Sequence, residues 1–524
     1  MIDTHLVARQ NDPPLSGKSD VRRYNLEALA QKVLGEGKVA SEGTSVLKTL
    51  AKEFGGFDKI PTDHPDYIRY LIQDVELVRE LSKSLVVDDY VLREHKVLWR
   101  LSHITRQGFR VDLDLAKALI AQRETRTEQQ KQKLHEVYGL PMGGKKPHTT
   151  VAGRAALEKA FADLGVQPVR TKTGEVATGK DAMNQMIEEH SDYPAVVELC
   201  QTLLAFNGER STAQTILQNT RSDGRIHPEV SAAQATGRIS VTKPGLTVMG
   251  KRDRSNIVER ALLLPDEGHV LISADLGQVD ARAIAMHAQD EGYIAALEPD
   301  KDLHSEMAAA VFGSEGWVGA GKHPRRSEAK AITHATTYGM GAAGLAQGAG
   351  ISQGEAAMQL ASLDEKFPAL AAWKRWVREE GRKQIIANAF GRRMRVAPGK
   401  EYTQAPAMIG QGTARDLMME GLLRLPRWLL PSLRGIVHDE IVLSVPEDHA
   451  EEAEAAVLEA LQFEHRITDE ASAVAVTAEA SDRGRDWLDC YRSEAGWPEV
   501  AREHRDQDSC EDPACTWHRR PVAA

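Results

Sequence analysis

Cysteines, aromatic residues and long apolar runs are all scarce in this sequence. Only 4 of its 524 residues are cysteine, and 5% are aromatic. So few cysteines in so long a chain exclude a disulfide framework and indicate reduced thiols. No apolar run reaches the roughly 18 residues of a membrane-spanning helix, and the N-terminus lacks the apolar core of a signal peptide. We therefore expect a cytoplasmic globular protein of roughly three domains that does not associate with a membrane.

An excess of positive charge is also missing. The chain has 66 Lys and Arg against 76 Asp and Glu, a net charge of −10, which by itself disfavours a nucleic-acid partner. The charge is unevenly distributed, however. Residues 321–400 hold 14 Lys and Arg against 6 acids, whereas residues 446–482 hold 1 Arg against 11 acids. A basic surface in the middle of the chain is therefore compatible with the acidic total.

Periodicity of apolar residues indicates a mixture of helices and strands. The helix expected first carries one apolar stripe, formed by Ile68, Leu71, Ile72, Val75, Val78 and Leu81. We expect helices at 67–85, at 86–133 with a break at 107–109, and at 196–220, 325–339 and 414–425. We expect a strand followed by a helix at 269–285, and a β-hairpin at 434–445.

Two acidic residues lie beside apolar strand runs. Asp275 follows the run 270–274, and Asp439 lies between two short apolar runs of the expected hairpin. A carboxylate in such a place must be paired, for example with an arginine, or must bind a metal. Two such acids, with Glu440 adjacent to the second, favour a divalent metal site with oxygen ligands. Two metal ions are a recurring solution for nucleotidyl transfer.

Cations and rings recur on one face of the helix expected at 325–339. Arg326, Lys330, His334 and Tyr338 follow one another at intervals of four residues, so they share a helical face. A solvated surface helix would account for the two cations but not for His and Tyr in register with them. Cations that hold phosphates and rings that approach a base or sugar suit a nucleoside triphosphate.

Six segments, in one order along the chain, resemble motifs of the family A DNA polymerases, the DNA polymerase I type. The resemblance is strong over about residues 236–445 and extends more weakly to about 490. The segments are Thr236-Gly237-Arg238-Ile239-Ser240 (T-G-R-L-S), Asp275 to Arg282 (D-Y-S-Q-I-E-L-R), Asp302-x-His304 with Val311-Phe312-Gly313, Arg326-x3-Lys330-x7-Tyr338-Gly339, Gln411-Gly412-Thr413-Ala414 and His438-Asp439-Glu440.

This resemblance implies an α+β multidomain fold, the right-hand polymerase. Such a fold has a helical thumb, a palm with an antiparallel sheet and helical fingers, here preceded by a partial RNase H-like exonuclease lobe. The implied domains are the partial 3′–5′ exonuclease-like lobe (1–90), thumb (91–230), first part of the palm (231–285), fingers (286–400), second part of the palm (401–490) and C-terminal tail (491–524).

The resemblance also implies the chemistry of metal and nucleotide. Asp275 and Asp439, with the backbone carbonyl of Leu276, would bind two Mg²⁺ ions, for which Mn²⁺ can substitute; Glu440 belongs to the same catalytic group. The primer 3′-hydroxyl would attack the α-phosphate and release pyrophosphate, with Lys330 as the acid toward pyrophosphate. The implied nucleotide-binding residues are Arg326, Lys330, His334, Tyr338, Asp280 and Gln278.

Primer–template DNA would be held by residues of the same motifs. Arg238, Gln411 and His438 would contact the primer terminus and the template in the minor groove, where donors read acceptors shared by all correct pairs. Thr236 and Arg282 are assigned to DNA by their motifs as well. We expect a monomer, with a processivity factor or another replisome protein as a candidate partner. The compact layout resembles bacteriophage replicative enzymes, which would place the protein in the host cytoplasm.

The sequence departs from the family pattern at several of these positions. The acidic residue after Gln278 is Asp280 rather than the longer Glu, so exclusion of a ribose 2′-hydroxyl is expected to be looser. His334 replaces a Phe or Tyr of the fingers helix, and Leu276 replaces a Tyr beside the first aspartate. These changes affect sugar selection and fidelity more than the reaction itself.

The amino-terminal region carries only part of an exonuclease pattern. Tyr70-x3-Asp74 resembles the third exonuclease motif, Y-x3-D, but the first two motifs would lie before Met1. One interpretation is a remnant lobe with weak or absent proofreading; another is a true start upstream of Met1. A third interpretation is that Tyr70 and Asp74 are an exposed pair on a helix and have no function.

Two other functions are open on sequence grounds. A single-subunit RNA polymerase shares the palm metals and the fingers pattern, but it carries H-D-S where this chain has Glu440, and it lacks the acid at Asp280. A catalytically inactive DNA-binding protein would not need Asp275 and Asp439. Near the C-terminus, Cys510, Cys515 and His518 could bind zinc, although their spacing fits no strong zinc template.

Overall fold

The computed structural model describes residues 2–15, 23–35, 46–144, 146–171, 173–207, 212–232, 234–249, 257–298, 301–314, 317 and 321–492. The chain forms two compact units. The first comprises residues 1–109, 227–247 and 265–485, and the second comprises residues 110–226, 248–264 and 486–524. Each unit is described separately below.

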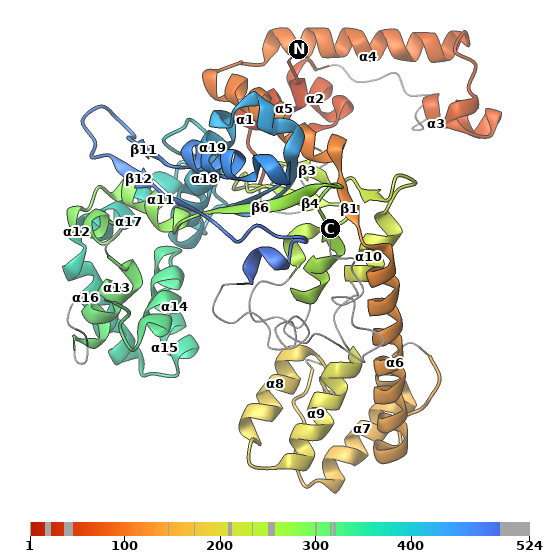
Figure 1. Ribbon diagram of the computed structural model, residues 1–524, viewed down its shortest axis with the longest axis vertical. Helices are drawn as coiled ribbons and strands as arrows, with labels where there is room; N and C mark the ends of the chain where they lie inside the picture. Colours follow the sequence, from red (N-terminus) through yellow and green to blue (C-terminus); the bar gives the residue numbers. More distant parts are fainter. Residues whose placement is uncertain are drawn as a thin grey trace. The chain divides into compact units, whose positions relative to one another are not determined.

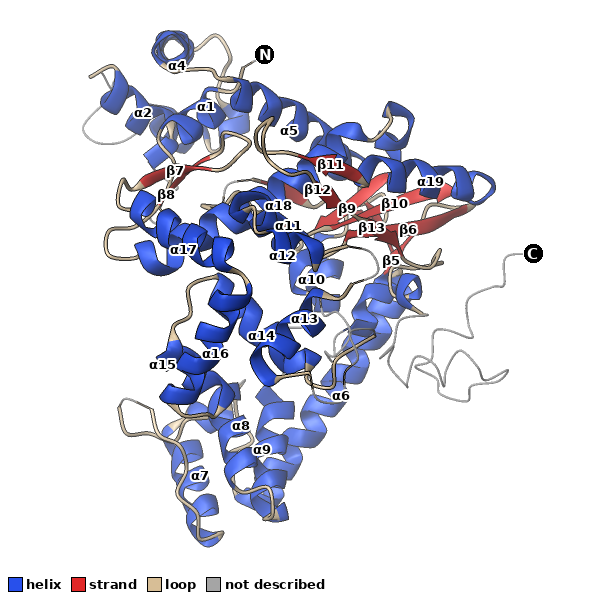
Figure 2. Cartoon of the chain, turned by 90° about the vertical axis from the view of Figure 1, so that its left-hand side faces the viewer, coloured by secondary structure: helices blue, strands red, loops and turns tan. Residues whose placement is uncertain are grey.

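A four-stranded antiparallel sheet forms the centre of the first unit (Figure 2). Its order is β13 (Ala478–Ala480), β6 (His269–Leu276), β10 (Glu440–Pro446) and β9 (Leu433–Val437). Strands β9 and β10 are the predicted hairpin, and β6 is the predicted strand, so both expectations are confirmed. Their inner residues are almost all buried, which explains why they read as apolar runs rather than as alternating patterns.

Helices cover this sheet and one another (Figure 1). Helix α19 (Ala450–Leu461) packs on β6, β10 and β13, and α5 (Asp89–Gln107) packs on β9. Helix α18 (Glu401–Arg424) contacts α5, α19, α11 (Val279–Ala288) and α17 (Pro368–Gly381).

Helix α18 begins 13 residues earlier than the sequence predicted, at Glu401 rather than at Ala414. Most of its length is buried between neighbouring helices. A helix that is buried all round shows no amphipathic period, which is the signal that sequence reasoning depends on.

A group of smaller helices follows α11. Helix α13 packs on α14 and α16, and α15 packs on α16. The turn between α15 and α16 passes through Gly350, which has a φ of +65°, and Ser352 then caps α16. The helices of this group are α12 (Glu291–Ala295), α13 (Leu303–Phe312), α14 (Arg326–Thr337), α15 (Ala342–Ala349) and α16 (Gln353–Lys366).

The first described residues of the chain form helices only, so no strand of an RNase H-like lobe is found among residues 2–15, 23–35 and 46–84. The helices are α1 (Thr4–Asn11), α2 (Leu26–Val33), α3 (Val46–Phe54) and α4 (Pro65–Ser84). Helix α4 confirms the helix predicted at 67–85.

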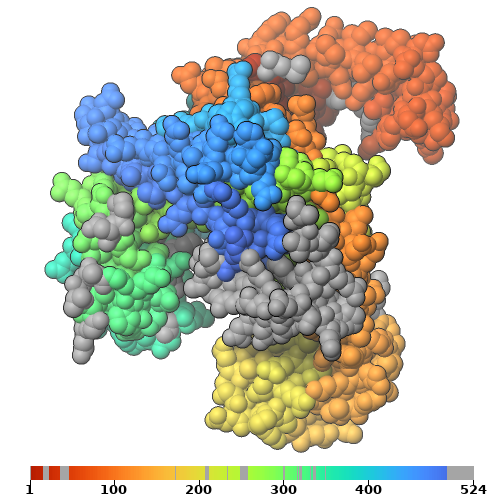
Figure 3. All heavy atoms as spheres, in the orientation of Figure 1, coloured from red at the N-terminus to blue at the C-terminus, as the bar shows by residue number. Residues whose placement is uncertain are grey.

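The apolar stripe of α4 is mostly exposed. Leu81 is buried, but Ile68, Leu71, Ile72, Val75 and Val78 are 39–67% exposed. The orange atoms of this helix form part of the surface in Figure 3. Periodicity identified the helix, but it could not say whether another element covers the stripe.

The second unit is mainly a helical bundle. Its core contains Leu134, Phe161, Met183 and Leu199. Cys200 is buried in the same core, and burial raises the pKa of its thiol to about 11, as expected for an inert reduced cysteine. The helices are α6 (Leu113–Tyr138), α7 (Val151–Asp163), α8 (Lys180–Glu189), α9 (Pro194–Asn207) and α10 (Thr212–Asn219).

Short strands complete both units. In the second unit, β2 (Arg225–Ile226), β1 (Phe109–Val111) and β5 (Leu263–Leu264) form a small sheet. The first unit has three two-stranded pairs: β3 (Glu229–Ser231) with β4 (Ser240–Thr242), β7 (Ile385–Ala387) with β8 (Arg393–Arg395), and β11 (Phe463–His465) with β12 (Val474–Val476). Among the described residues, no helix combines the length and hydropathy needed to cross a bilayer.

Candidate active site

The strand register brings the predicted acids together at one end of the central sheet. Asp275 on β6 lies directly opposite Glu440 on β10. The N–H of Leu276 donates a hydrogen bond of 3.0 Å to the carbonyl oxygen of Asp439. Residues directly opposite in an antiparallel pair share a sheet face, so the acids predicted from two distant motifs lie side by side.

Their surroundings differ in a way that separates their roles. Glu440 is buried, and the hydroxyl of Ser273 donates a hydrogen bond of 2.6 Å to its Oε1. Asp275 and Asp439 are only half-buried. The two half-buried carboxylates are therefore better placed to meet an ion from solvent than Glu440 is.

The donor set fits a magnesium ion better than a metal that needs a closed cage. In the described part of the chain, no group of three or more His, Cys, Asp or Glu side chains is arranged to hold a metal ion. Magnesium usually binds through one or two carboxylates, keeps several waters and takes its other ligands from substrate phosphates. Two aspartates beside a backbone carbonyl meet that requirement.

A third strand adds an acid that the sequence did not indicate. Glu479 on β13 lies directly opposite Asp275, on the other side from Glu440. Its position depends on a strand pairing between segments more than 200 residues apart, and only this register reveals it.

Arg238 and Asp280, predicted to contact DNA and nucleotide, form an ion pair. Nη2 of Arg238 lies 3.0 and 3.1 Å from the two carboxylate oxygens of Asp280. Asp280 is in the first turn of α11, which begins after Gln278, an exposed residue with a φ of +51°. Each residue of this pair is therefore held by the other.

Tyr338 lies close to the same pair. A Cβ added to Gly410 would be 3.3 Å from the ring carbon Cε1 of Tyr338, so the glycine leaves room for the ring. Burial, and then the negative charge of Asp280, raise the pKa of the Tyr338 hydroxyl. The hydroxyl is therefore neutral at physiological pH. Gln411, the next residue of α18, is half-buried.

The two cations of α14 differ in pairing and exposure. Arg326 forms a two-pronged ion pair with Asp302, with N···O distances of 2.8 to 3.0 Å. Burial of Asp302 opposes its ionisation, but the hydrogen bonds from Arg326 outweigh burial and lower its pKa to about 2. Lys330 is exposed. The side chain of His334 lies outside the described residues.

Arg282, which its motif assigned to DNA, is bonded to backbone carbonyls in this structure. It is buried, and its guanidinium donates hydrogen bonds to the carbonyl oxygens of Gly277 (2.7 Å), Ala475 (2.6 Å) and Leu297 (3.2 Å). By contrast, His438 is exposed, in a turn with a φ of +59°. The motif pattern alone could not separate the arginine that faces the site from the one that supports it.

The structure adds little about the predicted exonuclease remnant and the predicted zinc ligands. Tyr70 and Asp74 lie four residues apart on α4 and are half-buried. No further carboxylates are gathered around them in a metal-holding group among the described residues. Cys510, Cys515 and His518 lie outside the described residues.

A helix-covered antiparallel sheet that carries these acids, beside a helical group that carries Arg326 and Lys330, defines a polymerase of the right-hand type. The profile of DNA polymerase family A matches residues 115–489, and the chain belongs to that family. Members of this family generally use a divalent metal ion.

Individual relatives are similar over most of this chain. It is 30% identical to a thermostable DNA polymerase I of Thermus filiformis, over 88% of this chain and 61% of that protein. It is 28% identical to a DNA polymerase of Mycobacterium phage D29, over 86% of this chain and 74% of that protein. The chain thus spans between three fifths and three quarters of the length of these relatives.

A solved structure supports the fold. The polymerase domain of Pol1 from M. smegmatis, in complex with a DNA primer–template and a dNTP, superposes with a TM-score of 0.68 at 24% identity. The match covers 93% of this chain and 81% of that one.

Proposed function

We propose that this protein is a DNA-directed DNA polymerase that acts in DNA replication, of a phage in particular. It adds deoxynucleotides to a primer 3′-hydroxyl along a template and releases pyrophosphate. The observation that carries this proposal is the arrangement of Asp275, Asp439 and Glu440 on adjacent strands of a family A fold. The similarity to a phage polymerase supports the phage context.

Two Mg²⁺ ions, or Mn²⁺ in their place, would be held by Asp275, Asp439 and the carbonyl of Leu276. Bound there, they would activate the 3′-hydroxyl and neutralise charge on the phosphates. Glu440 would keep the β10 end of the site in place through its hydrogen bond with Ser273.

Phosphates of the incoming nucleotide would be bound by the α14 cations. Exposed Lys330 is free to approach them and to donate a proton to pyrophosphate. Arg326 would exchange the carboxylate of Asp302 for a phosphate, since a guanidinium pairs with either in the same two-pronged manner. Tyr338, Asp280, Gln278 and His334 would surround the base and sugar.

The DNA-contacting residues of this proposal are Arg238, Thr236, Gln411 and His438. The domains that go with it are the thumb (91–230), the palm (231–285 and 401–490), the fingers (286–400), the partial exonuclease-like lobe (1–90) with Tyr70 and Asp74, and the tail (491–524). The packing of α13 to α16 on one another supports the fingers as one subdomain. We further propose a monomer in the cytoplasm, of the host if phage-encoded, that works with a processivity factor or other replisome proteins.

Primer extension by the purified protein tests this function. With Mg²⁺ and all four deoxynucleotides the wild type extends a primer, whereas Asp275→Asn and Asp439→Asn each lose at least about 100-fold in rate, because a removed charge weakens metal binding. Asp448→Asn is the matched control, since this exposed palm acid lies outside the site.

The proposal fails if wild-type protein does not extend primers, or if Asp275→Asn extends them as fast as the control. Preference for ribonucleotides over deoxynucleotides would instead indicate an RNA polymerase.

A further inference from the structure

Arg392 is a buried cation for which the predicted functions have no use. It follows the tight turn of the β7–β8 hairpin, and its side chain is buried. A buried guanidinium is costly unless carboxylates pair with it. The contacts of Arg392 therefore indicate what the chain uses it for.

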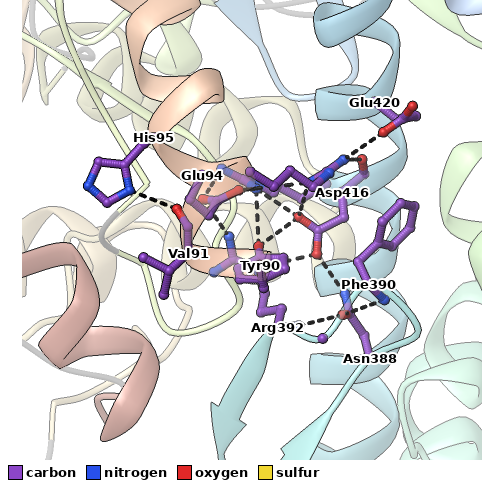
Figure 4. Close-up of polar contacts among 12 residues, drawn as sticks. Tyr90, Val91, Glu94, His95, Asn388, Phe390, Arg392, Asp416 and Glu420 are labelled. Carbon is purple, nitrogen blue, oxygen red and sulfur yellow. Dashed lines mark hydrogen bonds and ion pairs between the residues drawn. The ribbon is translucent and has the colours of Figure 1, made fainter. Parts of the chain in front are cut away.

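The carboxylates that pair with Arg392 come from two helices (Figure 4). Its Nη2 lies 3.2 Å from Oε2 of Glu94 on α5, and its Nε lies 3.4 Å from Oδ2 of Asp416 on α18. Arg415 bonds to the same two acids. The amide of Asn388 donates to Asp416 at 2.7 Å, which ties the hairpin itself to α18.

This network holds Asp416 ionised. Burial of Asp416 opposes its ionisation, but the charges of Arg392 and Arg415 outweigh burial, so its pKa is lowered. The side chains of Glu94, Arg415 and Asp416 are almost wholly buried. The guanidinium of Arg392 is thus held by ion pairs to two buried acids.

The same guanidinium of Arg392 lies against the backbone of Gly237. A Cβ built on Gly237 would overlap the guanidinium of Arg392, and Gly237 has a φ of +77°. A side chain at Gly412 of α18 would meet Met394 at 2.7 Å and the carbonyl oxygen of Thr236 at 3.5 Å. The segment 236–237 is therefore confined between the hairpin and α18.

The residue after Gly237 is Arg238, which points to Asp280. We infer that Arg392 is a positioning residue: it supports the backbone at Gly237 and so sets the direction in which Arg238 meets the primer terminus. This inference rests on the proposed function, in which Arg238 contacts DNA.

A double-mutant cycle tests the inference. Arg392→Met is expected to lower kcat/KM for primer extension by about 10- to 100-fold, the cost of a reacting group misplaced by about 1 Å. In an Arg238→Ala background the same change should have little further effect, because Arg392 acts through Arg238. A merely structural role would instead multiply the two losses.

Arg393→Met is the matched control, because this adjacent arginine is half-exposed and pairs with Asp88 at 3.6 Å. Its loss should be small in both backgrounds. If Arg392→Met does not fold, Arg392→Lys replaces it in the cycle, since lysine keeps a cation beside Glu94 and Asp416 but loses the planar guanidinium that lies against Gly237.

The Kd for primer–template is measured for the same four variants, because binding needs no catalysis. If the wild type is active and the free-energy effects of Arg392→Met and Arg238→Ala simply add in the double mutant, this inference alone is overturned. A wild type that neither extends nor binds primer–template would overturn the inference together with the proposed function.

Discussion

At the residue scale, two ion pairs join residues of the candidate site. Arg238 pairs with Asp280, and Arg326 pairs with Asp302. Such pairs keep half-buried charges satisfied, and a substrate must offer an equivalent partner to replace them. In the proposed function, substrate binding therefore requires each of these pairs to exchange partners.

Sugar selection is expected to depend on the length of the acid at Asp280. Asp280→Glu restores the missing methylene, so it should raise the preference for deoxynucleotides over ribonucleotides by roughly tenfold, the scale of one methylene in a binding pocket. The check is the ratio of kcat/KM values for the two sugars. Asp280→Ala should lower this ratio, and an unchanged ratio in both variants would remove Asp280 from sugar selection.

At the scale of elements, helices α11 and α18 meet through a half-buried histidine. Nε2 of His287 lies 2.9 Å from the hydroxyl of Thr413. Burial, and then the charge of His465, lower the pKa of His287 to about 4. The folded state therefore favours the neutral ring.

Acid should destabilise the protein partly through His287. The unfolded ring has a pKa of about 6.5, so between that pH and about 4 the unfolded state binds the extra proton. This contribution to stability is complete above about pH 6.5 and is lost as the pH falls. In His287→Gln the fall in Tm between pH 7 and pH 5 should be smaller by about 2 °C. Exposed His449→Gln should behave as the wild type does.

Helix α4 offers a comparison between two faces of one element. Changing Ile72 and Val75 together to Gln should alter the free energy of unfolding by less than about 0.5 kcal/mol per site, since both are exposed. Leu81→Gln should cost at least about 2 kcal/mol, because Leu81 is fully buried. Thermal unfolding measures both. A large loss in the first variant would mean that this face is covered in solution.

Element prediction succeeded where the pattern was local. The break at Gly108 and the hairpin around Asp439 are both present. It failed for the start of α18, because burial on all sides is a property of neighbours rather than of the segment itself.

At the scale of the whole molecule, charge is unevenly distributed along the chain, and the most basic and the most acidic stretch both lie in the first unit. The basic stretch 321–400 contains α14, with Arg326 and Lys330, and the acidic stretch 446–482 contains α19 and the short strands that follow it. A net charge of −10 therefore says little about this protein's partners. Local charge carries the information.

The sequence by itself determined the family, the two strand-associated acids and the Arg–Lys–Tyr spacing of the fingers helix, because each depends on residues close together in the chain. Tertiary structure alone decided that Glu479 lies opposite Asp275, that the guanidinium of Arg282 donates to the carbonyl oxygen of Ala475, and that Arg392 lies against Gly237. Those relations join segments roughly 150 to 200 residues apart, and only the register of strands and the packing of helices bring such segments together.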